Sequence, residues 1–348
     1  MPGAAKKPTT GWISGYRNLP IRESTTLDAR FGKTRQKTIN MKKQFFANFP
    51  KIAQQYGRTL LLILAIFAGV SIPQAAVFSG SIQYLVFGMM FLSFVGLKFE
   101  RSALRFSLLN VLVANIFVAL VAFYLLRPVD DNLALVGFMT GISPTAISAP
   151  VVIALLERRV DYVVAAVLLT NLSMALIVPF LLPWLGGNQV HVSIWEVLQS
   201  VAVVVILPLI LARLVRYLPQ SAQKPLFRAR SLTFILWVTA LFLVMANASH
   251  FIYTNVTVPL TFLLQIAAIA IVLCVVNFSL GALLSGREFR RESSQVLGQK
   301  NLSFTIWLSL AFINPIVALG PTFYIICHHT YNSYQLYRFA KQKAGSHV

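Results

Sequence analysis

Long apolar runs constrain this chain more than any other feature of its sequence. After Arg58, stretches of about 20 mostly apolar residues follow one another with only short polar connections. Runs of that length cross a bilayer as helices, whereas strands of a membrane barrel would show about 10 residues of alternating polarity. The composition agrees, because 57% of the residues are hydrophobic and only 11% are charged. The sequence therefore predicts an all-α polytopic membrane protein.

Ten apolar segments can be marked after the first 57 residues. They run approximately over 58–72, 80–97, 103–126, 132–156, 160–184, 192–217, 231–250, 258–284, 293–313 and 317–338. Of the 30 Lys and Arg residues, all but Arg127 and Lys300 fall in the two tails or at alternate connections. The positive-inside rule then predicts ten spans with both termini in the cytoplasm.

The two ends of the chain differ from the membrane part. Residues 1–57 hold eleven Lys or Arg but only Glu23 and Asp28 as acids, which is typical of a largely disordered basic tail that can contact anionic lipid. A short amphipathic helix over Lys42–Tyr56 is one interpretation. An Arg-rich, acid-poor start also occurs in transit peptides, so a plastid or other organelle membrane is the alternative to a cell (inner) membrane. Residues 58–338 would form the membrane domain and 339–348 a cytoplasmic tail.

The net charge of +20 raises the question of a nucleic-acid partner. Because the basic residues lie in the tails and at segment ends, we expect none. Lys300 is the exception to this distribution, since Gly298-Gln299-Lys300-Asn301 interrupts an apolar segment. A charge inside a membrane costs several kcal/mol, roughly 2.5–3.5 on insertion scales, and usually faces a partner or a watery cavity. The alternative is a lysine whose side chain reaches the membrane surface.

A second interruption lies in the fourth segment. Pro144 and Pro150 remove backbone donors, and Ser143, Thr145 and Ser148 surround them, so a broken helix is expected. Each interruption falls in the fourth segment of a five-segment half, in residues 58–184 and 192–338. Because each half contains an odd number of segments, the two halves must insert in opposite orientations. Broken segments at matched positions indicate a substrate site near the middle of the membrane. Two unrelated kinks are the simpler alternative.

These residues resemble a known family. The stretch from Arg290 through Gly298-Gln299-Lys300-Asn301 to Pro321-Thr322-Phe323-Tyr324 resembles helices nine and ten of the bile acid:sodium symporter family, with Gly96-Leu97-Lys98 and Pro144-Thr145 at similar places. The resemblance implies ten helices in two inverted five-helix repeats, a panel and a core domain, and helices four and nine broken where they cross. It also implies an organic anion as substrate and gives Asn110 the place of an amide in helix three.

The sequence departs from the family at its sodium ligands. Val296 and Lys300 stand where that family has an acid and a glutamine, Ala149 and Pro150 replace a serine and an asparagine, and Val163 and Val167 replace hydroxyls. Sodium needs several hard oxygen ligands, so sodium coupling is not expected. Lys300 could instead occupy the place of the cation. Because burial disfavours a charged amine, Lys300 could also carry a proton.

The predicted function is secondary transport of a small organic anion by alternating access, with no cofactor. The candidate substrate or ion pathway comprises Asn110, Ser143, Pro144, Thr145, Ser148, Gly298, Gln299, Lys300 and Asn301, with Ser303 and Thr305 as further neutral partners. The alternative is a non-transporting membrane sensor or scaffold on the same fold. We expect no enzyme, because no catalytic set is visible, and no metal, because His328 and His329 would point about 100° apart on a helix.

Overall fold

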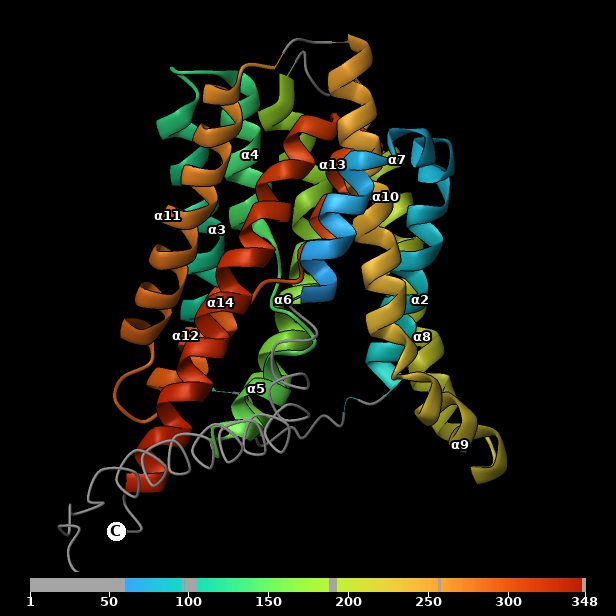
Figure 1. Ribbon diagram of the computed structural model, residues 1–348. Coiled ribbons are helices and arrows are strands. Elements are labelled where there is room, and N and C mark those ends of the chain that lie inside the picture. Colours follow the sequence, from blue (N-terminus) through green and yellow to red (C-terminus); the bar gives the residue numbers. More distant parts are fainter. Residues whose placement is uncertain (1–59, 96, 98–104, 188–192, 256–257, 346–348) are drawn as a thin grey trace, which may run out of the picture. The chain divides into compact units, whose positions relative to one another are not determined.

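The computed structural model describes residues 60–95, 97, 105–187, 193–255 and 258–345, and all regular structure in these ranges is helical (Figure 1). The part of the chain after Gly57 forms one unit, Arg58–Val348. The predicted basic tail and the amphipathic helix predicted at Lys42–Tyr56 lie outside the described residues.

Among the described residues, the first half of the membrane part shows seven helical elements. These are the helix Leu60–Ser71, the 3-10 helix η1 (Pro73–Ser81), α2 (Ile82–Val95), α3 (Ser107–Leu126), α4 (Asp131–Ile142), α5 (Ala149–Leu155) and α6 (Val160–Gly186). Asp130 caps α4, since its carboxylate accepts a hydrogen bond of 3.0 Å from the backbone N–H of Leu133. Pro150 lies in the first turn of α5, where its missing N–H leaves no bond unmade.

The regular structure of the described residues in the second half is likewise helical. Its elements are α7 (Ile194–Val201), the π-helix η4 (Ala202–Ile206), α8 (Leu207–Leu214), the 3-10 turn η5 (Val215–Tyr217), α9 (Gln220–Ala229), α10 (Leu232–Asn255), α11 (Leu260–Leu284), α12 (Arg290–Gly298), α13 (Leu302–Phe312) and α14 (Pro315–Gly345). Ser193 and Glu196 form a capping box at the start of α7, which begins this half with a well-defined helix end.

Length and hydropathy identify six candidate spans among the described residues. They are Pro73–Val95, Ser107–Leu126, Val160–Gly186, Ile194–Tyr217, Leu232–Thr254 and Leu260–Leu284. Helices α4, α5, α12 and α13 have 12, 7, 9 and 11 residues, so each alone is shorter than the roughly 20 residues that a bilayer requires. The multi-pass helical class is thus confirmed, whereas ten spans and inverted repeats stay predictions.

The structure differs from the expected segments in three places. The second segment begins at Pro73 rather than at residue 80, because η1 continues directly into α2. Helix α9 lies in a connection that was expected to be a turn. Helix α14 continues to Gly345, so most of the predicted C-terminal tail is helical. Helix α14 is not among the apolar spans, because it carries polar residues, several of which are buried: Thr322, His328 and Asn332.

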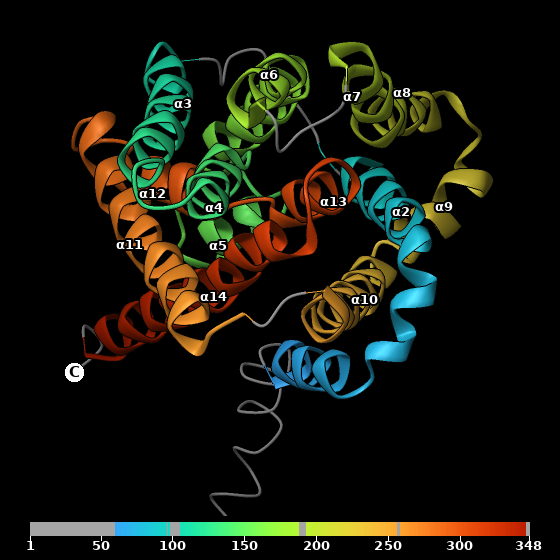
Figure 2. The same ribbon diagram turned by 90° about the horizontal axis from the view of Figure 1, so that it is seen from above.

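The helices form two contact groups, which Figure 2 shows end-on. In one, α2 packs against α8, α10 and η1, and the helix Leu60–Ser71 lies on α10. Gly69 makes that contact possible, because an added Cβ would lie 2.7 Å from Cβ of Met245. In the other, α4 packs against α3 and α14, and α11 against α12 and α14. Helix α13 contacts both groups through α2, α4 and α14.

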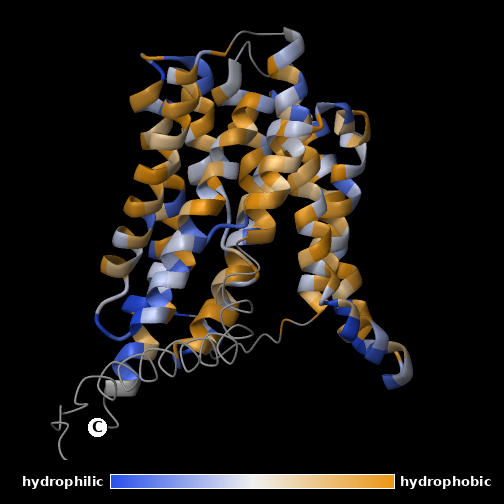
Figure 3. Ribbon diagram, in the orientation of Figure 1, coloured by the Kyte–Doolittle hydropathy of each residue, from blue (hydrophilic) through white to orange (hydrophobic). Residues whose placement is uncertain are grey.

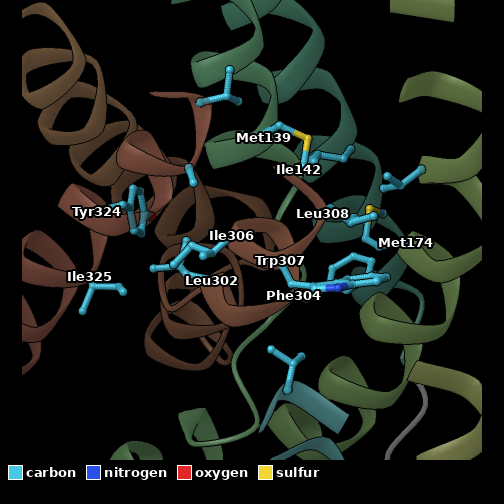
Figure 4. Close-up of a cluster of buried hydrophobic side chains, with 14 of the residues drawn as sticks. Met139, Ile142, Met174, Leu302, Phe304, Ile306, Trp307, Leu308, Tyr324 and Ile325 are labelled. Atoms are coloured by element: carbon cyan, nitrogen blue, oxygen red, sulfur yellow. The ribbon is translucent and has the colours of Figure 1, made fainter. Parts of the chain in front are cut away.

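Apolar packing around α13 fills the interior between these helices. Figure 4 shows Leu302, Phe304, Trp307 and Leu308 of α13 among side chains from α4, α6 and α14. Leu308 is fully buried and Phe304 is 1% exposed, although both belong to a helix of only 11 residues. The second half of a broken helix is therefore held by its neighbours rather than by its own length.

Polar residues collect at one end of the helices. Helices α5, α9 and α12 and the C-terminal part of α14 lie at that end (Figure 1), and hydropathy colouring marks α9 and the start of α12 as hydrophilic (Figure 3). Arg159 joins Asp161 and Glu288 there, at 3.3 and 3.1 Å, and Lys343 pairs with Glu157. Arg127 follows α3 at the opposite end.

Candidate functional site

Two interruptions separate α4 from α5 and α12 from α13. Helix α4 ends at Ile142 and α5 begins at Ala149, so Ser143–Ser148 leave the helix. Pro144 lies here, and it cannot donate a backbone hydrogen bond. Helix α12 ends at Gly298 and α13 begins at Leu302. Both interruptions fall where the sequence predicts them.

The two interruptions pair with each other through their backbones. Thr145 and Lys300 form an isolated antiparallel β-bridge. The N–H of Ala146 donates to the carbonyl of Gln299 at 2.7 Å, and the N–H of Asn301 donates to that of Pro144 at 2.6 Å. Each interruption thus supplies partners for backbone groups of the other that have no partner in their own helix. Inside a membrane, water is not available to satisfy such groups. This pairing defines the crossing, residues 143–148 together with 298–301.

Lys300 lies inside the crossing with 2% of its surface exposed. Its Nζ donates to the carbonyl of Gly141 at 2.8 Å and to Oδ1 of Asn115. Gly141 is in the last turn of α4, where carbonyls lack helical partners and the helix dipole is negative. The amine therefore caps α4. None of the described ion pairs includes Lys300.

Asn115 of α3 completes this cap. Its Nδ2 donates to the carbonyl of Ile142 at 3.1 Å, and its side chain is 3% exposed. The amide was predicted at Asn110, and that residue is exposed near the start of α3. The correction has a simple reason: five residues turn a helix by about 140°, so only one of the two amides can face α4.

The end of α12 has a neutral cap instead. Tyr324 of α14 donates its hydroxyl to the carbonyl of Gly298 at 2.8 Å, and Thr145 donates to the carbonyl of Val296 at 2.8 Å. Asn277 of α11 donates in turn to the Tyr324 hydroxyl at 3.4 Å. The two half-helix ends at the crossing are therefore unequal: α4 meets an amine, and α12 meets two hydroxyls.

Helix α6 supports the crossing from a further side. The N–H of Thr145 donates to the hydroxyl of Thr170 at 3.1 Å, and Nδ2 of Asn171 donates to the carbonyl of Thr145 at 2.9 Å. Asn301 donates to Oδ1 of Asn171 at 3.1 Å. Val163 and Val167 are fully buried on the same helix. Polar groups from α6 do reach the crossing, but from positions 170 and 171.

Two side-chain pairs also join the two broken helices. The hydroxyls of Ser143 and Thr305 lie 2.6 Å apart in a buried position. Gln299 donates through Nε2 to the hydroxyl of Ser148 at 3.0 Å, while its buried Oε1 has no partner. Ser148 is exposed, so this pair is the part of the crossing that is open to its surroundings.

The predicted pathway residues thus come together with one exception. Of the predicted pathway residues, only Asn110 lies outside the crossing. Of the two further neutral partners, Thr305 joins it through Ser143, whereas Ser303 lies in the first turn of α13 and outside it. Asn115, Thr170 and Tyr324 were missed as partners. Their only signal was a polar residue in an apolar segment. Whether these residues bind a substrate or an ion stays a prediction.

One cavity among the described residues lies apart from Lys300. It has a volume of about 420 Å³ between α2, α7–η4 and α13, and no charged residue lines it. Its polar groups come from Gln83, Tyr84, Gln199 and Ser200, and its inner wall includes Trp307. The cavity thus borders α13, the second half of a broken helix. None of the residues that line it is a predicted site residue.

Metal binding has no support among the described residues, where no group of three or more His, Cys, Asp or Glu side chains could hold an ion. The ring of His328 meets Tyr324 edge-on with centroids 5.8 Å apart, and the ring of His329 lies tilted against Trp237 at 5.3 Å. Cys274 and Cys327 are free cysteines.

Comparison with known proteins does not assign this chain to a family. No known protein-family model matches the chain, and no curated protein matches its sequence. The class of protein that the fold defines is a multi-pass helical membrane protein. The feature particular to this chain is the buried amine at the crossing of two broken helices.

Proposed function

We propose that this chain is a secondary transporter of a small organic anion in which Lys300 replaces the coupling cation. The observation that carries the proposal is the position of its amine at the end of α4, beside the bridge that joins the two broken helices. Broken helices in matched positions are a feature of transporters whose site lies near the bilayer midplane.

The proposed architecture has ten spans in two inverted repeats. In it, α4 with α5 and α12 with α13 are the broken spans, and the group of α2, α8 and α10 is the panel against which the remaining helices move. The resemblance to the bile acid:sodium symporter family supports this assignment. The basic end lies in the cytoplasm, because the described Lys and Arg residues other than Arg127 and Lys300 belong to that end.

Lys300 fits a tethered cation better than a substrate ligand. The amine is 2% exposed, and it donates to a carbonyl and to an amide oxygen, both of which a cation would attract. A cation at a helix C-terminus is stabilised by about 0.3–1 kcal/mol, and by up to about 2 kcal/mol when partly buried. A built-in charge of this kind removes the need for sodium.

The substrate would then meet other groups of the crossing. Ser148 is exposed, and its partner Gln299 retains an unpaired Oε1. The first turn of α13 has no side-chain cap, so its N–H groups favour a negative charge nearby. A carboxylate or sulfonate head can accept hydrogen bonds from the Ser148 hydroxyl and from these N–H groups, whereas Oε1 of Gln299 can only accept a bond from a donor on the substrate.

Proton coupling is the second mechanism for the same residue. An ammonium group and a neutral amine can each donate two hydrogen bonds, and two acceptors are present at Asn115 and Gly141. Deprotonation of Lys300 would remove the positive charge that stabilises the C-terminus of α4. The tethered cation is therefore our first choice.

Uptake by proteoliposomes tests the proposal. The purified full chain is reconstituted, and uptake and counterflow of labelled carboxylates and sulfonates are measured in sodium-free buffer. We expect saturable uptake that Lys300→Gln removes and Lys341→Gln, at an exposed position of α14, retains. Equal uptake with and without the Lys300 side chain would contradict the role of the amine. Failure of every anion would favour the sensor or scaffold, for which a buried, fully bonded lysine is a structural element.

A further inference from the structure

Helix α9 is a short helix at the polar end with no buried residue. It follows η5 after Leu218 and Pro219, and α10 begins three residues after its last residue, Ala229. Two spans therefore hold α9 at the level where they leave the apolar region. In Figure 1 it extends sideways from the end of α8, away from the remaining helices.

The charge of this region is strongly one-sided. Between Glu196 and Glu288 the sequence contains no acid, and the basic residues in that interval before Arg287 gather next to or within α9: Arg213, Arg216, Lys224, Arg228 and Arg230. None of them takes part in the ion pairs of the described residues. Arg216 donates to the carbonyl of Leu97, which ties the region to the end of α2. The charges of the other four lack an acidic partner within the described chain.

Apolar side chains lie beside these charges. Tyr217, Leu218 and Phe227 are 81%, 44% and 43% exposed, while Leu226 is only half-buried. Within α9, Ala222, Leu226 and Ala229 follow the spacing of one helix face, and Lys224 and Arg228 follow that of another. Basic and apolar faces on one helix, with an exposed aromatic residue, are typical of a helix that lies in a membrane interface.

We propose that α9 is an interfacial helix whose basic residues bind anionic phospholipid headgroups of the adjoining leaflet. The helix is bounded by spans on both sides, so its charges stay within reach of headgroups. Phe227 of α9 and Tyr217 of the preceding η5 are exposed aromatic residues, a kind of side chain that interfacial helices bury among the headgroups. A soluble acidic partner would satisfy the charges but would leave the apolar side chains in water. This inference does not depend on transport, since a scaffold with the same α9 would bind the same lipids.

Lipid binding by the purified full chain tests the inference. In neutral detergent, short-chain phosphatidylglycerol should raise the thermal unfolding midpoint more than phosphatidylcholine does. Lys224→Gln with Arg228→Gln should weaken the phosphatidylglycerol response roughly 30-fold in apparent affinity, as expected for two charges near an anionic surface. The control, Arg338→Gln with Lys341→Gln on α14, removes the same charge at the same end of the helices.

A second measurement places α9 directly. An environment-sensitive dye is attached at Phe227→Cys in a chain with Cys274→Ala and Cys327→Ala, and its emission should shift to the blue in phosphatidylglycerol nanodiscs more than in phosphatidylcholine ones. Equal losses in the two double variants, equal responses to the two lipids, or a dye shift caused by soluble polyglutamate instead of lipid would each overturn the proposal.

Discussion

Thr145 and Lys300 face each other across an antiparallel backbone bridge, although 154 positions of sequence separate them. Thr145 also donates its hydroxyl to Val296 at 2.8 Å, and Lys300 donates its amine to Gly141 at 2.8 Å. Each residue therefore caps the broken helix to which the other belongs. The two interruptions cannot be understood separately, because each contains the hydrogen-bond partners of the other.

Lys300→Gln tests the charge at this bridge. The amide keeps a donor but removes the charge that stabilises the end of α4, and hydrogen bonds to charged groups contribute about 1.5–3 kcal/mol. We expect the initial uptake rate to fall by about tenfold or more at every pH, or uptake to become sodium-dependent. Uptake of labelled anion with and without sodium measures both outcomes. A rate like that of the wild type in sodium-free buffer would remove Lys300 from the mechanism.

The pH profile separates a tethered cation from a proton carrier. A lysine that stays charged throughout the cycle predicts a flat rate of uptake from about pH 5 to 9, because its own protonation does not change. A carrier must release its proton once per cycle, so its rate would change with pH across that range. The measurement is initial uptake with the internal and external pH kept equal. A sigmoidal profile would replace the first mechanism with the second.

Asn115→Leu and Asn110→Leu form a matched pair on α3. The first removes a partner of Lys300 and leaves the carbonyl of Ile142 unpaired. Each buried polar group without a partner costs about 1–3 kcal/mol, so we expect the free energy of unfolding to fall by about 2–4 kcal/mol. The second changes an exposed residue and should alter it by less than about 0.5 kcal/mol. Thermal unfolding in detergent compares them, and equal effects would argue against Asn115 as a cap.

Tyr324→Phe removes a single hydroxyl from the end of α12. The carbonyl of Gly298 and Nδ2 of Asn277 then lose that partner, so we expect a loss of stability of about 1–3 kcal/mol. Tyr334→Phe on the same helix is the control, since its ring is 53% exposed. The difference between their unfolding midpoints measures the cap. If the two variants unfold alike, the hydroxyl has no such role.

Gly298→Ala tests how closely α12 approaches α11. An added Cβ would lie 2.6 Å from Cε1 of Phe278 and closer still to two other ring atoms. Phe278 cannot move freely, because its ring packs against Tyr331 at 4.3 Å. We expect destabilisation of about 1–3 kcal/mol from overpacking, with partial recovery by Phe278→Leu. Gly80→Ala, where a Cβ meets nothing within 4 Å, is the control. A neutral effect at Gly298 would show that the contact is loose.

The sequence was sufficient for the class of fold and for the place of the interruptions. Apolar runs of about 20 residues allow only helices, because lipid offers no hydrogen bonds to the backbone. Proline at position 144 and lysine at position 300 break such runs for local reasons, so no knowledge of their neighbours was needed. The same reasoning selected Ser143, Thr145, Ser148 and Gln299, which the structure brings to the crossing.

Tertiary structure decided which side chains meet the interruptions. Asn110 and Asn115 are equally polar and lie on one helix, and only the packing of α3 on α4 determines which of them faces the end of α4. For the same reason Tyr324 becomes a cap of α12 and Thr170 becomes the acceptor for the N–H of Thr145. Helix α9 and the continuation of α14 to Gly345 also escaped prediction, because short or polar helical stretches carry a weak apolar signal. Local sequence determines where a helix must end, whereas the partner for its open carbonyls comes from distant residues that only folding brings close.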